Sequence, residues 1–429
     1  MSEKYHDPAE YIRGIQQVLV SDKKRIGFLF GAGSSLAVKK GKTSLTVPAI
    51  GKMTTDIVSE IAAIDAKYES ALDEIKDELA ASYNIETILS NLEQKSKLLH
   101  GPNKLNKLTK SEFEELIQLV KSSIRQKVSV HKDAAGKSVS IETVNDLVQT
   151  DFANWIGQAE RKFPIEIFTT NYDFLFELGL EQKQIPYYDG FCGSYRPFFN
   201  PESVEDLSFL TNQTKVWKIH GSLGWHFDEN TERILRVNPD ENDILIYPSS
   251  LKYKDSKKQP YESLMDRLSS FLKQDDTILF TCGYSWGDEH INERIISALK
   301  TKTSSHVIGL LYDKFKDQTS ASPNYHLEEV DGIAKIALNN PKISFYGYRH
   351  AVIGCRQGQW RLRTEPSKDD TVQVNLYYDE DGPEIDTATG VETWTGLGEF
   401  VLPDFSNLVS FLDQMIAYNE IKELGNNAK

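Results

Sequence analysis

The sequence predicts an α/β fold built on a Rossmann-like, mostly parallel β-sheet, with a large helical insertion and a C-terminal α+β module. Two observations lead to this prediction. Short apolar segments typical of buried strands alternate with segments of helical periodicity, as expected when helices connect parallel strands. Glycine, amide, hydroxyl and imidazole groups then follow several of the apolar segments. Ligands of open α/β sheets bind in the loops beyond the carboxyl ends of the strands.

The first elements are indicated by caps and periodicity. A helix is expected to begin at Pro8, because Asp7 can cap its N-terminus and proline suits the first turn. The segment Arg25 to Phe30 is the first buried strand. From about residue 50 to residue 160, apolar residues recur at helical spacing without the alternation of a surface strand. This predicts a helical insertion, in which residues 84–92 are expected to pack a helix over the cleft.

Further strands are predicted at Ile165–Thr169, Lys215–Ile219, Ile244–Tyr247, Thr277–Cys282 and His306–Tyr312. Helices are expected between several of them, near Phe174, from Tyr261 to Leu272 and from Glu289 to Leu299. Apolar strands separated by helices favour a parallel sheet.

Beyond Pro341 the pattern becomes richer in strands. The predicted elements are strands at Ile343–Tyr348, Gln359–Leu362 and Thr371–Tyr378, an exposed acidic loop from Asp379 to Gly390, and an amphipathic helix from Phe405 to Ile416. We therefore expect two domains. Residues 1–340 carry the sheet and the insertion, and residues 341–429 form a strand-plus-helix module for packing or assembly.

The composition indicates an ordinary soluble globular protein. Of the 429 residues, 39% are hydrophobic and 26% are charged, which is enough for a sizeable core. The formal net charge of −14 argues against direct nucleic-acid binding by this chain. Three widely spaced cysteines cannot form a four-cysteine zinc site. The polar N-terminus and the lack of a spanning apolar run favour a cytoplasmic protein without membrane contact.

A glycine loop follows the first strand and consists of Gly31, Ala32, Gly33, Ser34 and Ser35. Glycine lets the backbone turn tightly and bring N–H groups against a phosphate, and serine hydroxyls can donate there as well. A simple strand-to-helix turn would show the same pattern, because a lone Gly-x-Gly is a weak signal. In combination with the motifs below, we interpret the loop as a pyrophosphate cradle.

Polar residues also follow the next two strands of the predicted sheet, namely Thr169, Thr170, Asn171, Asp173 and His220. Asn171 would hold a water or a ribose hydroxyl beside the anomeric carbon, and Asp173 would orient the loop or the ribose. Both residues would equally serve as helix caps. His220, as a neutral imidazole, could accept a proton from ribose or water, although a lone histidine is more often structural. His226 fits less well and is interpreted as structural.

A fourth group of polar residues lies late in the predicted sheet. Gly283, Ser285 and Asp288 follow a strand and precede a helix, so they would bind the adenosine half of a dinucleotide or simply cap the helix. Asp313 ends another strand and could reach the adenine or its ribose, or it could be a solvated loop acid.

In their order along the chain, these motifs resemble the sirtuin signature: the glycine loop, the Thr-x-Asn-x-Asp segment ending at Asp173, the His220–Gly221 pair, and the Gly-x-Ser turn at Gly283. The longer form of the last motif, Gly-Tyr-Ser-x-x-Asp-x-His-Ile-Asn, is similar to bacterial sirtuin-like NADases of antiphage defence, of the type encoded beside a HerA-like ATPase. The resemblance covers roughly residues 20–315 in scattered blocks. Thr170 departs from it, because sirtuins usually carry glutamine there.

The resemblance implies that residues 1–340 form a sirtuin-like NAD-binding domain. NAD would be the substrate, hydrolysed without a metal to nicotinamide and ADP-ribose in antiphage defence by NAD depletion. Asn171, Asp173 and His220 would form the catalytic group, and the other motif residues would bind NAD. The same resemblance implies a homo-oligomer and a HerA-like ATPase partner. Two other functions stay open. One is protein deacylation, although the zinc ribbon of sirtuin deacylases is missing; the other is a non-catalytic NAD or ADP-ribose sensor that scaffolds an ATPase.

Overall fold

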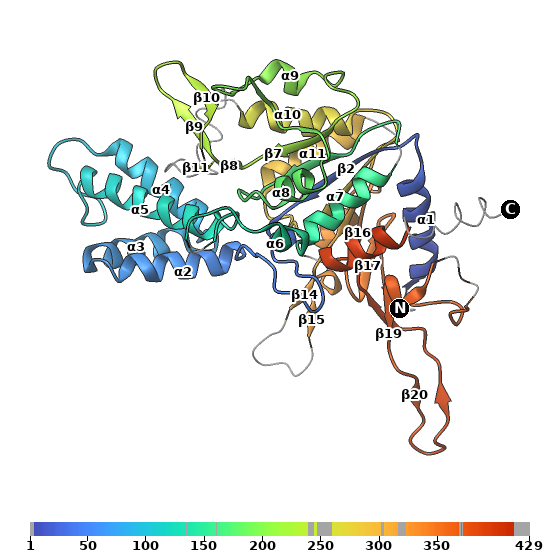
Figure 1. The fold of residues 1–429 in the computed structure, drawn as a ribbon. Coiled ribbons are helices and arrows are strands. Elements are labelled where there is room, and N and C mark those ends of the chain that lie inside the picture. The colour runs from blue at the N-terminus through green and yellow to red at the C-terminus, as the bar shows by residue number, and fades with distance from the viewer. Residues whose placement is uncertain are drawn as a thin grey trace.

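The computed structural model describes residues 4–133, 135–159, 161–238, 244–246, 260–301, 304–315, 323–330, 332–368, 370 and 372–415. Its centre is a ten-stranded sheet with helices on both faces (Figure 1). In spatial order the strands are β1 (Tyr5–His6), β18 (Arg356–Trp360), β17 (His350–Ile353), β16 (Ile343–Tyr346), β13 (His306–Leu310), β12 (Thr277–Cys282), β2 (Arg25–Phe30), β3 (Glu166–Thr169), β7 (Thr214–Lys218) and β4 (Tyr187–Tyr188).

The pairing pattern places a switch point beside β2. From β2 the chain first adds β3 and β7 on one side, and it then resumes at β12 on the other side and continues to β13 and β16. These pairings are parallel, whereas β17 pairs antiparallel with β16 and β18. The structure thus confirms a mixed α/β fold with a large, mostly parallel sheet. Its carboxyl edge between β2 and β12 is where such sheets bind ligands.

Both faces of the sheet are buried under helices. One core contains side chains of α1 (Pro8–Val20), α7 (Val148–Gln158), α8 (Leu175–Gln182) and the helix of residues 405–415. The other contains side chains of α10 (Tyr261–Leu272), α11 (Glu289–Thr301) and α12 (Ala334–Leu338). On β2, Phe28 and Phe30 enter the first core and Leu29 the second. A strand buried on both faces needs such a continuous apolar run rather than alternation.

Helices fill residues 50–158, between β2 and β3. They are α2 (Ile50–Ala62), α3 (Ala66–Leu79), α4 (Ile85–Leu98), α5 (Lys110–Val128), α6 (Ile141–Asn145) and α7. The helices α2 to α5 project from the body and are called the helical lobe below (Figure 1). The lobe has its own buried core, which includes Ile57, Leu72, Leu89 and Val120. That core continues into Tyr172, Leu175 and Leu223, so the lobe packs against loops at the carboxyl edge of the sheet.

Smaller sheets and turns complete the fold. The strands β5 (Phe191–Cys192), β6 (Phe198–Phe199), β10 (Arg233–Arg236) and β9 (Trp225–Asp228) form one sheet, and β14 (Lys314–Phe315) pairs with β15 (Asn324–Tyr325). Short helical elements are η1 (Ala32–Ser35), η2 (Ala80–Ser82), α9 (Pro201–Glu205) and η3 (His326–Glu328).

Some predicted elements were wrong. The segment at Ile244 forms β11 (Ile244–Ile246), which pairs antiparallel with β8 (Gly221–Leu223) instead of joining the main sheet, and Tyr247 lies outside the described residues. Thr371 of the strand predicted at Thr371–Tyr378 lies outside the described residues, and the rest of that segment contains the turn η4 (Val374–Leu376), followed by β19 (Tyr378–Glu380). There the amide of Leu376 donates to Gln373, so a local turn takes the place of a strand ladder.

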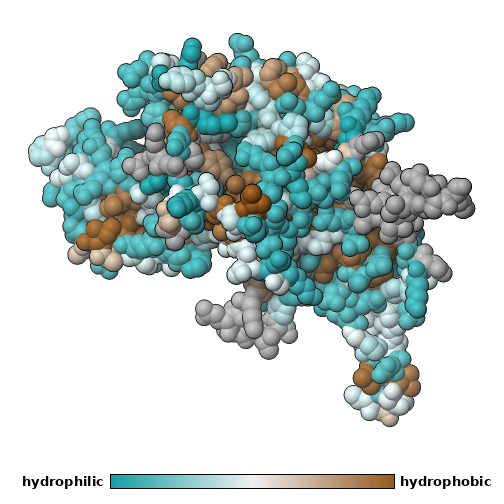
Figure 2. All heavy atoms as spheres, viewed as in Figure 1, coloured by the Kyte–Doolittle hydropathy of each residue, from teal (hydrophilic) through white to brown (hydrophobic). Residues whose placement is uncertain are grey.

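The acidic segment after β19 is exposed as predicted, but it forms a hairpin rather than a loop. Strands β20 (Glu384–Ile385) and β21 (Glu392–Thr393) pair antiparallel, and β22 (Gly398–Phe400) returns to pair with β19. The hairpin projects from the body (Figure 1), and hydrophobic atoms lie at its tip (Figure 2). Its apolar Ile385 and Val391 are more than half exposed.

The strands on either side of residue 340 belong to one sheet, because β13 pairs in parallel with β16. The helix of residues 405–415 also packs on the central strands, with Phe405 5.0 Å from Phe30 between ring centroids. A role of residues 341–429 in assembly stays a prediction. Among the residues that the model describes, no helix combines the length and the apolar character that crossing a bilayer requires.

Candidate functional site

The glycine loop after β2 contacts the turn after β12 directly. The amide of Gly31 donates to the carbonyl of Cys282 (3.2 Å), and the amide of Gly33 donates to the carbonyl of Gly283 (3.0 Å). A Cβ atom at Gly33 would lie 2.6 Å from the Cα of Gly283. The glycines therefore allow two backbones to meet at the switch point. These two N–H groups already have protein acceptors, which differs from the expectation that they face a phosphate.

Asn171 is fixed on this loop. The side-chain nitrogen of Asn171, Nδ2, lies 3.1 Å from the Gly31 carbonyl, 3.1 Å from the Ser34 hydroxyl and 2.8 Å from the Ser35 hydroxyl. The Ser35 hydroxyl donates to Asp173 Oδ2 (2.7 Å), and the Ser34 hydroxyl donates to the Gly31 carbonyl (2.8 Å). Thus the serine hydroxyls connect the loop to the Asn171 segment. A contact between these hydroxyls and a nucleotide stays a prediction.

The Thr169 segment arises from the end of β3. The Thr169 hydroxyl accepts from the backbone N–H of Asn171 (3.0 Å), and the Thr169 carbonyl accepts from the backbone N–H of Ile219 (2.8 Å). The Thr170 amide donates to the Phe30 carbonyl at the end of β2 (3.1 Å). These bonds hold the ends of β2, β3 and β7 together. They bring the predicted residues of three strands to one edge of the sheet.

His220, in the turn between β7 and β8, lies between two carboxylates. Its Nε2 is 3.0 Å from Asp288 Oδ2, and its Nδ1 is 3.8 Å from Glu86 Oε1. The same Glu86 oxygen accepts a hydrogen bond from the Tyr172 hydroxyl. His220 is only 7% exposed, so these neighbours determine its environment. A carboxylate bonded to one ring nitrogen selects the tautomer and the orientation of an imidazole.

Asp288 contacts the imidazole of His220, and a contact of Asp288 with the adenosine half of a dinucleotide stays a prediction. Its other oxygen, Oδ1, accepts from the amides of His290 (2.9 Å) and Ile291 (3.3 Å) and caps α11. The turn before it is fixed by Asn292, which accepts from the Tyr284 hydroxyl (3.0 Å) and donates to the Trp286 carbonyl (2.8 Å). The Gly-Tyr-Ser-x-x-Asp-x-His-Ile-Asn segment is thus a folded unit that presents Asp288 to His220.

Two predicted residues lie outside this cluster of contacts. Ser285 is exposed, and its hydroxyl accepts from the Gly287 amide (3.3 Å). Asp313 is buried, and its carboxylate accepts from the amides of Tyr348 (2.9 Å) and Leu327 (3.2 Å). Burial raises the pKa of Asp313 although these amides oppose the shift. Asp313 therefore joins loops of the later strands, and a contact with adenine stays a prediction.

A buried ion pair supports the floor of the site. The Lys218 ammonium, at the end of β7, lies 3.0 Å from Glu177 Oε1 and also donates to the Asp173 carbonyl. Burial raises the pKa of Glu177, while Lys218 opposes the shift. The pair fixes the backbone of Asp173 relative to β7. The end of β7 in turn sets the position of His220, which follows that strand by two residues.

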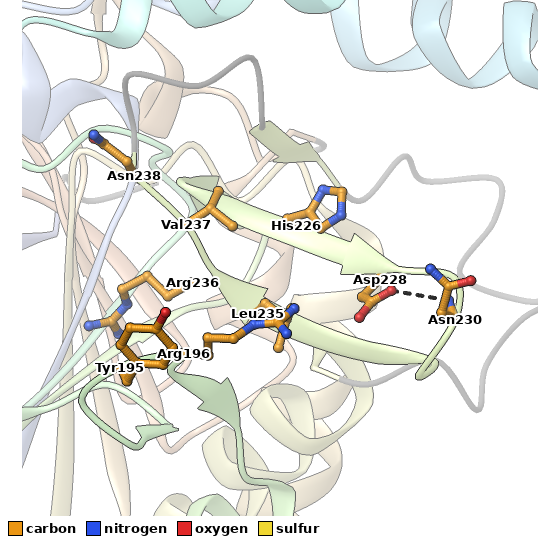
Figure 3. Close-up of a pocket in the computed structure, with 9 residues that line it drawn as sticks. All are labelled: Tyr195, Arg196, His226, Asp228, Asn230, Leu235, Arg236, Val237 and Asn238. Carbon is orange, nitrogen blue, oxygen red and sulfur yellow. Dashed lines mark hydrogen bonds between the residues drawn. The ribbon is translucent and has the colours of Figure 1, made fainter.

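A separate hollow of about 460 Å³ lies beside β9 and β10 (Figure 3). It is lined by Tyr195, Arg196, His226, Asp228, Asn230, Leu235, Arg236, Val237 and Asn238. His226, interpreted from the sequence as structural, is among them, whereas His220 and Asn171 are not. The hollow is therefore distinct from the site at the switch point.

Sequence reasoning missed Glu86 and Tyr172. Glu86 lies near His220 and accepts a hydrogen bond from Tyr172. In the sequence, however, Glu86 is far from both residues and belongs to an amphipathic helix, where a glutamate is ordinary. Only the docking of the lobe reveals its contact. In the described part of the chain, no three His, Cys, Asp or Glu side chains are grouped to hold a metal ion.

Comparison with known proteins connects this geometry with a family. A search of curated proteins gave no match. A family model described as a SIR2-like domain matches residues 165–330. The matched segment contains Asn171, Asp173, His220 and Asp288, whereas the glycine loop precedes it. SIR2-like domains use NAD, so the match suggests an NAD-related activity. Residues 165–330 of this chain are thus similar to the SIR2-like domain family.

Proposed function

We propose that the protein is an NAD glycohydrolase, which cleaves the nicotinamide–ribose bond of NAD to give nicotinamide and ADP-ribose. The observation that carries the proposal is the hydrogen bond of 3.0 Å between His220 and Asp288, beside the switch point where Asn171 is held by the glycine loop. A general base oriented by a carboxylate is suited to activate water. The SIR2-like match supplies NAD as the substrate class.

The chemistry assigns a role to each group. The glycosidic bond breaks with positive charge on the ribose, and nicotinamide leaves with the bonding electrons as a neutral base. Water then forms the new bond to the anomeric carbon, and its proton passes to His220. Asp288 orients the imidazole of His220 through its hydrogen bond. Asn171 fixes the glycine loop against which the dinucleotide would lie, and Asp173 accepts a hydrogen bond from Ser35 of the same loop. The carboxylates of Glu86 and Asp288 favour the positive charge of this reaction electrostatically.

The glycine loop is proposed as the binding element for the dinucleotide. The close contact of Gly31 and Gly33 with Gly283 leaves no room for a side chain between the two turns. Because the Gly31 and Gly33 amides donate to Cys282 and Gly283, the proposed contact with the pyrophosphate would come from other groups of this loop at the carboxyl edge of the sheet. Thr170, Ser285 and Asp313 are proposed to contribute to the same binding, as the resemblance implies.

The biological setting follows from the resemblance to bacterial defence proteins. We propose that NAD depletion after phage infection is the role of the activity, in the cytoplasm, and that a homo-oligomer and a HerA-like ATPase control it. Such an activity would harm the cell if it were constant, so control by assembly is a reasonable expectation.

The test is a time course of NAD loss with identification of the products, run with and without an acyl-lysine peptide. His220→Ala should lower the rate by roughly 10² to 10⁴, the range that general acid–base catalysis contributes. Asn171→Ala should also lower the rate, because the glycine loop loses the side chain that fixes it. His306→Ala is the matched control, because His306 is the first residue of β13 and so lies at the amino end of that strand, away from the carboxyl ends that carry the site. It should leave the rate unchanged.

Three results would contradict the proposal. Hydrolysis that survives His220→Ala and Asn171→Ala would refute the assigned roles. Nicotinamide release that requires the peptide would identify a deacylase. Tight NAD binding without turnover, even with the ATPase present, would identify a sensor.

A further inference from the structure

Glu86 is the point at which the helical lobe reaches the site. It occupies the first turn of α4, and its Oε1 accepts from the Tyr172 hydroxyl and lies 3.8 Å from His220 Nδ1. Asp288 approaches the opposite ring nitrogen from the turn before α11, at 3.0 Å. The imidazole is thus enclosed by two carboxylates that belong to separate parts of the fold.

The position of Glu86 is fixed by the start of its helix. Asn84 Oδ1 accepts from the amides of Glu86 (3.0 Å) and Thr87 (3.1 Å), and Thr87 Oγ1 accepts from the Asn84 amide (3.0 Å). This capping box aligns the first turn. The Ile85 amide donates to Thr54 of α2 (2.9 Å), and the Ile85 side chain is buried in the core of the lobe. A carboxylate near a helix N-terminus is also favoured electrostatically.

The carboxylates of Asp288 and Glu86 face the His220 ring, and the Tyr172 hydroxyl donates to Glu86. Burial raises the pKa of Tyr172 well above its ordinary value, and Glu86 adds to the shift, so the phenol is neutral and acts as a donor. The Tyr172 hydroxyl therefore holds the Glu86 carboxylate on the Nδ1 side of the imidazole.

We propose that Glu86 is a positioning residue for His220, so that the helical lobe completes the site by delivering one carboxylate to the imidazole. The proposal rests on the proposed function in that His220 is the base of the reaction. Its geometric part, the coupling of Glu86 to the imidazole, is independent of the reaction. A negative charge beside Nδ1 favours the protonated ring that forms when water loses its proton.

The experiment compares Glu86→Gln with Glu93→Gln in the full chain. The matched control Glu93 lies farther along the same helix and pairs with Lys121 (2.8 Å), within the lobe. Two readouts are needed. One is NAD hydrolysis as a function of concentration and pH. The other is the pH at which the His220 imidazole becomes protonated, followed by NMR and assigned with a His220→Gln variant.

The expected result for Glu86→Gln is a kcat lower by about tenfold, with KM changed less than about twofold, because part of the contribution of the base is lost. The NMR titration of His220 should move to lower pH, since one carboxylate no longer favours the protonated ring. Glu93→Gln should behave as the wild-type protein in both readouts. A loss of packing alone would not move the titration of His220.

An unchanged titration of His220 in Glu86→Gln would overturn the proposal. Should that variant fail to fold, Glu86→Ser gives the same reading, because serine suits a first helical turn and also removes the charge. If the wild-type protein hydrolyses no NAD, the proposed function fails, and the NMR titration still decides whether Glu86 acts on His220.

Discussion

At the scale of single residues, the Gly-x-Gly pattern has a physical explanation besides phosphate binding. The amides of Gly31 and Gly33 donate to the turn after β12, and Gly283 has a φ of +65° that favours glycine. Three glycines are needed because the two turns approach within backbone contact at the switch point. The sequence indicated where glycine is needed, but it could not distinguish contact with a ligand from contact with a neighbouring turn.

We predict that Gly33→Ala destabilises the protein by about 1–3 kcal/mol, because its Cβ would overlap the backbone of Gly283 and the turns would have to separate. The matched control is Gly14→Ala, where the added methyl group meets open space on α1 and should stabilise the helix by up to about 1 kcal/mol. Urea denaturation of both variants measures the difference. Equal stability of Gly33→Ala and the wild-type protein would contradict the close contact.

The positions of residues just after predicted strands identified candidate site residues, but they did not identify the side chains that contact those residues. Asn171, Asp173 and His220 follow apolar runs, and parallel strands bring such residues to one edge. The contact of Asp288 with His220 depends on the turn geometry between β12 and α11, and the contact of Glu86 depends on how a lobe packs. Both belong to tertiary structure, for which a single sequence carries no local signal.

At the scale of elements, a buried ion pair joins β3, β7 and α10. Arg267 of α10 donates to both carboxylate oxygens of Glu166 (2.6 and 3.0 Å), and the Trp217 indole donates to the same carboxylate (2.7 Å). Arg267 is 1% exposed, so its charge depends on this partner. The network sets the distance between the helix and the strands that carry Asn171 and His220.

We predict that Glu166→Gln lowers the free energy of unfolding by about 3–5 kcal/mol, because it leaves the buried Arg267 charge without compensation. In the control Asp266→Asn, the lost pair with Arg294 (2.6 Å) is exposed on both sides and should cost less than about 1 kcal/mol. Guanidinium denaturation compares the two. Similar losses in both variants would show that burial of the pair has no special weight.

The helix of residues 405–415 brings a carboxylate close to another one. Burial raises the pKa of Asp413 to about 6, and Asp151 of α7 adds to the shift while Lys39 opposes it. The folded protein thus binds this proton more tightly than the unfolded chain does. The stability that the proton supplies is present below about pH 4 and is lost as the pH rises through about 6.

We predict that Asp413→Asn is more stable than the wild-type protein above pH 6, by about 1 kcal/mol after allowance for partial exposure to solvent. The difference should decrease towards pH 4, where the wild-type carboxyl is protonated as well. Thermal or chemical denaturation at several pH values measures it. A difference that is independent of pH would show that the charge of Asp413 is not the cause.

Helices with a clear hydrophobic periodicity were predictable from the sequence, whereas segments whose structure depends on tertiary packing were not. The helices at Pro8, Ile50 and Tyr261 begin where the sequence predicted. The alternating Val372, Val374 and Leu376 suggested a strand, but their side chains pack on the first core from an irregular turn. Partial burial of every second residue is thus not sufficient for a strand, because a strand also needs a partner with free backbone groups.

At the scale of the whole molecule, the lobe and the sheet share a boundary at the site. The core of the lobe includes Tyr172 and Leu223, which lie close to the turn that carries His220, and Glu86 is next to Ile85 of the same core. The sequence predicted an insertion of helices, but its contact with His220 required the assembled structure. The continuation of the sheet into β16 was equally hidden, because the sequence after Pro341 indicated strands without showing which strand they would pair with.

We predict that a cavity in the lobe lowers activity at a distance. Leu89→Ala removes a fully buried side chain from α4, one turn beyond Glu86, and should cost about 2–4 kcal/mol. Because the start of α4 positions Glu86, the same change should reduce NAD hydrolysis per folded molecule. The control Leu19→Ala makes a comparable cavity under α1, a helix that lies away from the lobe (Figure 1). With similar losses of stability, unequal losses of activity would show that the lobe supports the site, whereas equal activities would separate the lobe from the chemistry.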